Sequence, residues 1–339
     1  MPVEFQEEKM KCKVCFNTQG NIPHLAKELL YGIDEVFSYY ECVNCGCIQI
    51  REIPELIEKY YPSDYHCYMH KNSNNPLINY CRVLRNRYAV FGRNLLGKIF
   101  YQFKPQEALN SLKYVSPQKS WRILDVGCGG GALINFLGEM GFNNTIGIDP
   151  FIGENVFFNN GAKIFKKYLY EVEGKWDLIM LHHSLEHFPD QKETLIKISE
   201  LLNENGNCLI RIPISTSFAW EHYGTNWIGF DAPRHLFIHS IKSLSLLAEK
   251  SGLLIKKIVF DSSEMQFWAS EQSLRGIHFY ASNSYYINKK NSIFSRMEIK
   301  KYRKMAQKFN LENRGDQAIF ILQKQNLDKY KCILNQKLL

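Results

Sequence analysis

The chain of 339 residues carries a formal net charge of +8, with 45% hydrophobic and 22% charged residues. This composition excludes a disordered chain, a collagen-like repeat and a small disulfide-stapled scaffold. No run approaches the roughly 18 consecutive apolar residues of a membrane span, and the first ten residues do not resemble a signal peptide. We therefore expect a cytoplasmic protein, in which cysteines are more often metal ligands or buried thiols than disulfides.

Two cysteine pairs near the N-terminus have the spacing of zinc knuckles. Cys12 and Cys15 form one C-x-x-C pair, and Cys42 and Cys45 form the other. Four thiolates suit the tetrahedral coordination of a structural zinc ion. We therefore predict a zinc-binding β module over residues 1–60, in which the metal supports folding and performs no chemistry. Other residues can substitute if one of the four is not a ligand: Cys47, His66, Cys67 and His70.

The next stretch, residues 61–115, has the character of a helical lid or linker. Its apolar residues recur at spacings of three and four, as on one face of a helix. The residues that carry this pattern are Leu84, Tyr88, Phe91, Leu95 and Ile99. We expect this amphipathic segment to act as a lid or as the surface of a homodimer.

From residue 122 onward, short apolar strands alternate with amphipathic helices. This alternation predicts a parallel sheet with helices on both faces. We assign one α/β domain to residues 116–326, with an insertion at 260–315 before the last strand and a tail at 327–339. The predicted strands are 123–126, 145–148, 177–181, 208–212, 253–259 and 318–322.

A glycine-rich turn links the first of these strands to the following helix. Gly127, Gly129 and Gly131 allow a tight turn that leaves room for a ligand. Asp149 ends the second strand, where a carboxylate accepts hydrogen bonds from ribose hydroxyls. Strand, turn, helix, strand and acid together predict a cofactor of nucleoside type.

Two cofactors fit this turn. Gly127, Gly129 and Ala132 match the dinucleotide fingerprint G-x-G-x-x-[GA], so NAD is one candidate. Asp125, two residues before the first glycine, favours S-adenosylmethionine, because a carboxylate there can bind the cationic aminoacyl end but would repel a pyrophosphate. The chain also leaves no separate catalytic domain of the kind that many dehydrogenases carry.

Three motifs resemble those of the class I S-adenosylmethionine-dependent methyltransferases. They are LDVGCGGG at 124–131, GIDP at 147–150 and WDLIMLHHSLEHFPD at 176–190. The resemblance covers roughly residues 120–325 and implies a Rossmann-like sheet of seven strands whose last strand is antiparallel. It implies that these residues bind the cofactor: Asp125, Gly127, Cys128, Gly129, Gly131, Asp149 and His182. The stretch 165–168 lacks the acidic residue that often contacts adenine in the family, so the adenine contact is unassigned.

Polar residues gather where the fourth strand ends, at the edge where open α/β sheets bind their ligands. His183, Glu186 and His187 are candidates for the base that methyl transfer to a hydroxyl requires. Glu186 and His187 are also candidate ligands of a divalent ion, as proposed for some quinone-type O-methyltransferases. His235, after the fifth strand, is an alternative base. Each of these side chains can instead serve to cap the next helix.

The acceptor is the least constrained part of the prediction. Zinc knuckles on such a domain resemble two groups, the bacterial sugar and polysaccharide methyltransferases and certain ribosomal RNA methyltransferases. The fourth strand lacks the Pro-Pro tetrapeptide of enzymes that methylate base amines, which favours a sugar or nucleotide-sugar acceptor. Arg234 would then meet a phosphate, while aromatic residues nearby would stack on sugar rings and Trp268, Glu271 and Gln272 would cover the acceptor.

Three other functions stay open. The basic stretch 289–304 has the charge expected of an RNA-binding surface, so RNA methylation is one alternative. A quinone or another small molecule is a second possible acceptor. The third alternative is a zinc-containing binding module whose methyltransferase domain is only a scaffold.

Overall fold

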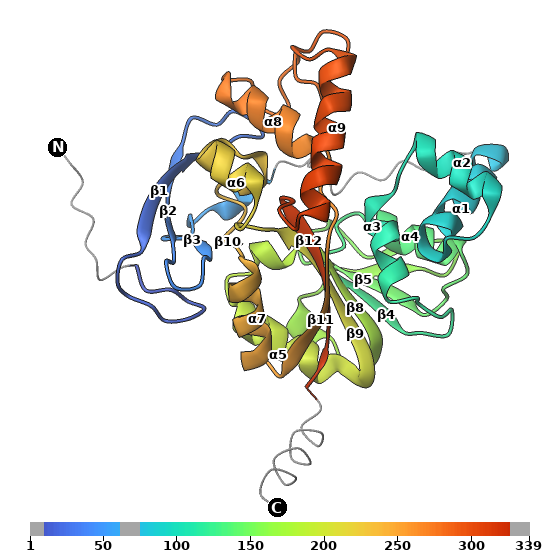
Figure 1. Ribbon diagram of the computed structural model, residues 1–339. Helices are drawn as coiled ribbons and strands as arrows, with labels where there is room; N and C mark the ends of the chain where they lie inside the picture. Colours follow the sequence, from blue (N-terminus) through green and yellow to red (C-terminus); the bar gives the residue numbers. More distant parts are fainter. Residues whose placement is uncertain (1–9, 62–74, 326–339) are drawn as a thin grey trace, which may run out of the picture.

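The computed structural model describes residues 10–61 and 75–325 (Figure 1). Its centre is an eight-stranded sheet with the order β11-β12-β9-β8-β4-β5-β7-β6. The strands are β4 (Ile123–Val126), β5 (Thr145–Ile148), β6 (Val156–Phe157), β7 (Lys163–Phe165), β8 (Trp176–His182), β9 (Leu202–Pro213), β11 (Leu253–Phe260) and β12 (Gln317–Lys324). Strands β7, β5, β4, β8 and β9 run parallel, and the strand order reverses between β4 and β8. Open sheets of this kind bind ligands at such a reversal, at the carboxyl ends of the strands.

The strand directions in this sheet agree with the sequence prediction, but the number of strands does not. β12 is antiparallel to both of its neighbours, as the family resemblance implies. The predicted total of seven strands is corrected to eight by β6, an edge strand of two residues that pairs with β7. A strand this short has no periodicity that a sequence reading can detect.

Helices cover both faces of the sheet. α4 (Ala132–Glu139) packs on one face, and α5 (Gln191–Leu201) with α7 (Ile241–Lys250) packs on the other (Figure 1). The side chains of β8 alternate between the two faces of the sheet. Met180 belongs to the hydrophobic cluster under α4, and Leu181 belongs to the hydrophobic cluster under α5 and α7. Successive strand residues point to opposite faces, so one short apolar strand contributes to two cores.

Two helices replace the single amphipathic helix expected before the domain. α1 (Pro76–Phe91) ends at Gly92, whose φ of +66° is left-handed, and α2 (Leu95–Phe103) begins three residues later. The two helices pack closely, because a Cβ at Gly97 would lie 2.3 Å from the carbonyl oxygen of Leu84. A short helix, α3 (Glu107–Ser111), then leads to the sheet.

The N-terminal sheet is completed by a strand from the α/β part of the chain. It contains β1 (Ile22–Lys27), β2 (Val36–Glu41), β3 (Ile48–Ile50) and β10 (Phe237–Ile238). β10 pairs with β3 from a position almost 190 residues later. Ser215 Oγ also donates a hydrogen bond of 2.6 Å to the Gly46 carbonyl. Residues 10–60 therefore supply only three of the four strands of this sheet.

The insertion before the last strand forms two helices, α8 (Met265–Leu274) and α9 (Arg296–Leu311), near the small helix α6 (Phe218–Tyr223). Trp268 and Gln272 are buried in this layer, which corrects the expectation that they cover the acceptor. Within the described residues, we find no helix with the length and apolar character needed to cross a membrane.

Candidate functional site

The glycine turn occupies the carboxyl end of β4. Gly127, Gly129 and Gly131 have φ angles of +73°, +51° and +74°, which side chains rarely adopt. A Cβ at Gly127 would lie 2.6 Å from the Cβ of Ser184, and one at Gly131 would lie 2.0 Å from Ile164 Cδ1. These two glycines are thus required for packing as well as for the turn.

Two carboxylates flank the turn. Burial raises the pKa of Asp125 to about 7, and the nearby Asp149 adds to the effect. Burial also raises the pKa of Asp149, although its two oxygens accept hydrogen bonds from the backbone N–H groups of Gly129 (3.0 Å) and Phe151 (2.9 Å). A cationic ligand group beside Asp125 would favour its ionised form. The pair therefore suits the amino group and ribose hydroxyls of S-adenosylmethionine.

His182 and Cys128 line the same edge of the sheet. Both ring nitrogens of His182 are buried without a hydrogen-bond partner among the described residues, and burial lowers its pKa to about 3. Buried polar atoms usually have partners, so this ring fits a contact with a bound cofactor. The Cys128 thiol packs over Gly147, where a Cβ would lie 2.6 Å from its sulfur. His182 remains a predicted cofactor contact.

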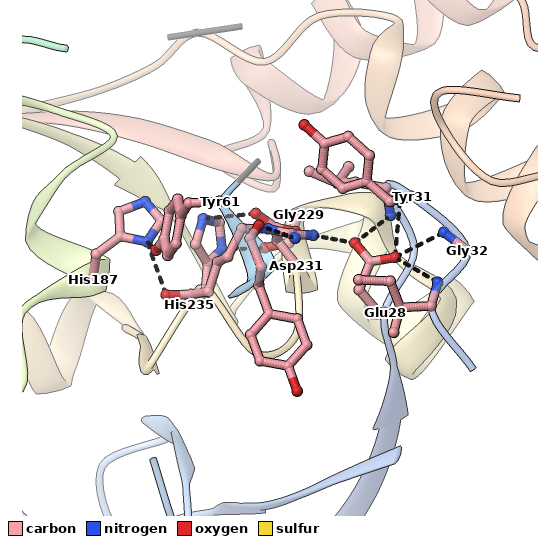
Figure 2. A network of polar contacts seen from close by, with 12 residues as sticks. Glu28, Tyr31, Gly32, Tyr61, His187, Gly229, Asp231 and His235 are labelled. Carbon is pink, nitrogen blue, oxygen red and sulfur yellow. Dashed lines mark hydrogen bonds and ion pairs between the residues drawn. The ribbon is translucent and has the colours of Figure 1, made fainter. Parts of the chain in front are cut away.

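A second group of polar side chains converges beside this edge. Glu186 and His187 follow β8, and His235 follows β9. The rings of His187 and His235 lie side by side (Figure 2). One ligand atom from each of the three lies within 4.8 Å of the others. The Glu186 carboxylate is buried, and neither oxygen makes a hydrogen bond to a described residue. The nearest nitrogens are His183 Nδ1 at 3.4 Å and His235 Nε2 at 3.8 Å from Oε1.

Backbone carbonyls fix the orientation of the two histidines in this group (Figure 2). His187 Nδ1 donates to the Arg234 carbonyl at 2.8 Å, and His235 Nδ1 donates to the Gly229 carbonyl at 3.0 Å. Since a carbonyl oxygen only accepts, both rings carry hydrogen on Nδ1, which leaves Nε2 of each ring to face other groups.

The charges of Glu186 and His235 do not balance each other. Burial lowers the pKa of His235 to about 4, so this ring is neutral at neutral pH. Burial alone would raise the pKa of Glu186, but His183, His187 and His235 together lower it to about 2. An ionised carboxylate therefore faces the lone pair of a neutral imidazole, an arrangement that a bound cation stabilises.

The structure does not support His183 as the base. Arg211 Nη1 donates to His183 Nε2 at 2.6 Å, and a guanidinium can only donate. The accepting nitrogen of His183 is thus occupied, and its Nδ1 faces Glu186. Arg211 itself is held by Asp261 at 2.6 Å and by Glu107 at 2.9 Å. His183 is better described as a link between Arg211 and Glu186.

Arg234 cannot bind a phosphate, contrary to the sequence expectation. Its side chain has no exposed area and donates to Glu28 and Asp231, both at 2.5 Å, and to the Tyr60 carbonyl at 3.0 Å. Glu28 also accepts from the backbone N–H groups of Leu30, Tyr31, Gly32 and Ile33 (Figure 2). The arginine instead ties the N-terminal sheet to the loop that carries His235.

Two of the aromatic residues expected to stack on sugar rings are also internal. Trp227 and Phe230 are fully buried, and the Trp227 Nε1 donates to Asp316 at 3.1 Å. Both therefore belong to the core of the loop that follows β9.

Four residues of this site were not predicted. Asp231 had a usable signal, because it precedes Arg234 and His235 by three and four residues. Glu28 and Tyr61 reach the site from the distant N-terminal region, and the Tyr61 hydroxyl lies 3.1 Å from His187 Nδ1. Such long-range neighbours leave no trace in local spacing. Arg211 lies inside a strand predicted only as core.

The predicted zinc ligands come together as a separate cluster. One sulfur from each of Cys12, Cys15, Cys42 and Cys45 lies within 4.8 Å of the others. The sulfurs of Cys12 and Cys45 are 3.6 Å apart and those of Cys15 and Cys42 are 3.4 Å apart. A tetrahedron with Zn–S bonds of about 2.3 Å has edges of about 3.8 Å, so the four sulfurs fit zinc. Of the substitutes, Cys47 is buried outside this cluster, whereas His66, Cys67 and His70 lie outside the described residues.

Comparison with known proteins gives the class of this chain. Residues 95–257 match the family described as "Methyltransferase domain". A ubiquinone biosynthesis O-methyltransferase from Bordetella avium is 28% identical over 179 residues, which cover 45% of this chain and 72% of the relative. One from Azorhizobium caulinodans is 29% identical over 124 residues, which cover 33% of this chain and about half (49%) of the relative. Among solved structures, cyclopropane synthase MmaA2 from Mycobacterium tuberculosis is similar, with a TM-score of 0.43 and 14% identity over 75% of this chain and 100% of that chain.

The matched range runs from the start of α2 into β11, and it includes the glycine turn, both flanking carboxylates and the polar group after β8. The chain is an S-adenosylmethionine-dependent methyltransferase.

Proposed function

We propose that this methyltransferase transfers the methyl group to a hydroxyl oxygen of a small-molecule acceptor at the carboxyl ends of β8 and β9. One observation carries the proposal, namely the convergence of Glu186, His187 and His235 beside the cofactor edge. The names of the two curated relatives, both O-methyltransferases, support the same reaction class.

These three residues are also a fitting donor set for a divalent cation. Each histidine offers one imidazole nitrogen, and Glu186 offers a buried carboxylate that has no hydrogen-bond partner among the described residues. Such nitrogen and oxygen ligands suit a metal of the transition series. A cation held there supplies positive charge that lowers the pKa of a bound hydroxyl. The carbonyls of Arg234 and Gly229 hold the two rings in the required orientation.

A sugar acceptor receives less support from the described residues. The sequence expectation depended on Arg234 for a phosphate and on the aromatic residues near it for stacking. Arg234 is saturated by carboxylates, and Trp227 and Phe230 are buried in the core. A compact acceptor that offers hydroxyl oxygens to the Glu186 group therefore fits the site better than a nucleotide sugar.

The N-terminal cluster is proposed as a structural zinc site. Four cysteine sulfurs close the coordination shell, and Gln49 Nε2 donates to Cys12 Sγ at 3.0 Å, as an outer partner of a thiolate would. We expect one zinc per chain by elemental analysis of the purified protein. Substituting Cys42→Ser should release the metal and lower the melting temperature. Retention of zinc in that variant would contradict the assignment.

The reaction is tested with catechol, a probe with two adjacent hydroxyls. Formation of S-adenosylhomocysteine should require catechol and stop when EDTA removes the cation, and added divalent cation should restore it. Glu186→Gln should lower turnover by about 100-fold or more while cofactor affinity is unchanged. Glu193→Gln, the same change at an exposed position on α5, is the matched control.

Two results would contradict the proposal. Full turnover by Glu186→Gln would remove the carboxylate from the mechanism. Turnover with a sugar nucleotide such as UDP-glucose, together with none on any phenol, would return the acceptor to the sugar class.

A further inference from the structure

Four side chains on the outer face of α2 are apolar and exposed, and we call them the α2 patch: Leu95, Leu96, Ile99 and Phe103, with exposed fractions of 75%, 56%, 43% and 85%. They cover one continuous arc, because residues four apart lie above one another on a helix. The opposite side packs on α1 through Gly97. The described part of the chain leaves this arc open to solvent.

The charged residues of α1, of α2 and of the segment between them are all basic. Residues 76–106 contain six Lys or Arg and no Asp or Glu. Arg82 is paired with Glu139, and Arg85 is buried. The remaining four are exposed and border the patch in the sequence: Arg87, Arg93, Lys98 and Lys104. Exposed apolar side chains bordered by cations are typical of helices that lie in the headgroup region of anionic membranes.

We propose that α2 docks this methyltransferase on the surface of an anionic lipid bilayer. The α2 patch would enter the boundary of the acyl chains, and the four exposed cations would meet lipid phosphates. A second copy of the chain complements this face less well, because a two-fold contact would bring the same exposed cations together. Figure 1 shows α1 and α2 at one edge of the molecule, away from the N-terminal sheet.

Hydrogen bonds connect the segment that follows α2 with the polar group after β8. α3 begins four residues after Phe103, and its Glu107 accepts a hydrogen bond of 2.9 Å from Arg211. The same Arg211 donates to His183. Docking through α2 would therefore place the bilayer on the side of the molecule from which Glu107 reaches Arg211 at the end of β9. Docking needs no turnover, so it can fail or succeed independently of the proposed reaction.

Vesicle sedimentation tests the proposal directly. The purified protein should pellet with phosphatidylcholine vesicles that contain about 30% phosphatidylglycerol and much less with phosphatidylcholine alone. Leu95→Ser combined with Phe103→Ser should lower the partition coefficient about tenfold or more, as should Lys98→Glu combined with Lys104→Glu. Unchanged binding of S-adenosylhomocysteine by these variants would show that they fold.

A matched control separates docking by α2 from attraction by net charge. Lys301→Glu with Lys304→Glu makes the same charge change on α9, where both lysines are exposed, and this variant should pellet like the wild type. Equal loss in the α9 variant would mean diffuse attraction and would overturn the proposal. So would wild-type protein that stays in the supernatant, including a protein that forms dimers dependent on Leu95 and Phe103.

Discussion

The predicted cofactor side and the proposed acceptor side of this site are assembled in different ways. The cofactor side comes from one short stretch, in which β4, the glycine turn and β5 lie within 26 residues from Ile123 to Ile148. The acceptor side combines the loops after β8 and β9 with Glu28 and Tyr61 from the N-terminal region. A local motif can therefore define the first side, whereas only the tertiary fold can define the second.

Because the two sides are assembled differently, we expect that a substitution can impair one side and leave the other intact. Changes in the turn should remove cofactor binding and leave the acceptor network intact. Changes in the acceptor network should disturb folding or turnover before they disturb cofactor binding.

The largest effect is expected at the turn. Gly129→Val places a β-branched residue at a φ of +51° and adds a side chain where the backbone must approach the cofactor. Calorimetric titration should show an affinity for S-adenosylhomocysteine at least about 100-fold lower. Gly153→Ala is the control, because a Cβ there meets nothing within 4 Å. Wild-type affinity in Gly129→Val would refute the cofactor site.

A large effect on stability is expected at the acceptor side. Arg234→Met leaves the buried carboxylates of Glu28 and Asp231 without their cation, which should cost about 3–5 kcal/mol of unfolding free energy. Chemical denaturation measures this difference. Arg275→Met, which removes an exposed ion pair with Glu271, should cost less than about 1 kcal/mol. Equal losses in the two variants would show that Arg234 does not join the two regions.

A smaller effect is expected in how the affinity of the cofactor side depends on pH. Asp125, with a pKa raised to about 7, is largely protonated below that pH in the empty protein. Because the cationic end of the cofactor favours the carboxylate, binding at lower pH must release a proton. Affinity should therefore fall as pH decreases below about 7, by at most about tenfold per pH unit. Titrations across this range should show no such trend in Asp125→Asn, and a persisting trend would assign it to another group.

The sequence predicted much of the sheet and named Glu186, His187 and His235, which the structure brings together, but it did not reveal the distant residues that surround them. Strands β4 and β5 match their predicted bounds. The break at Gly92 shows a limit, since helical spacing of apolar residues continued through a turn. Arg234 shows another, because nothing local revealed that Glu28, more than 200 residues earlier, would saturate it. Burial and pairing of distant charges are set by tertiary contacts, which residue spacing does not encode.

The most direct test of the divided site is calorimetric titration of S-adenosylhomocysteine into the wild type and into Glu186→Gln, with NAD in parallel. We predict micromolar affinity for S-adenosylhomocysteine in both proteins and no binding of NAD. Binding of NAD alone would contradict the cofactor assignment. Loss of S-adenosylhomocysteine binding in a folded Glu186→Gln would contradict the separation of the two sides.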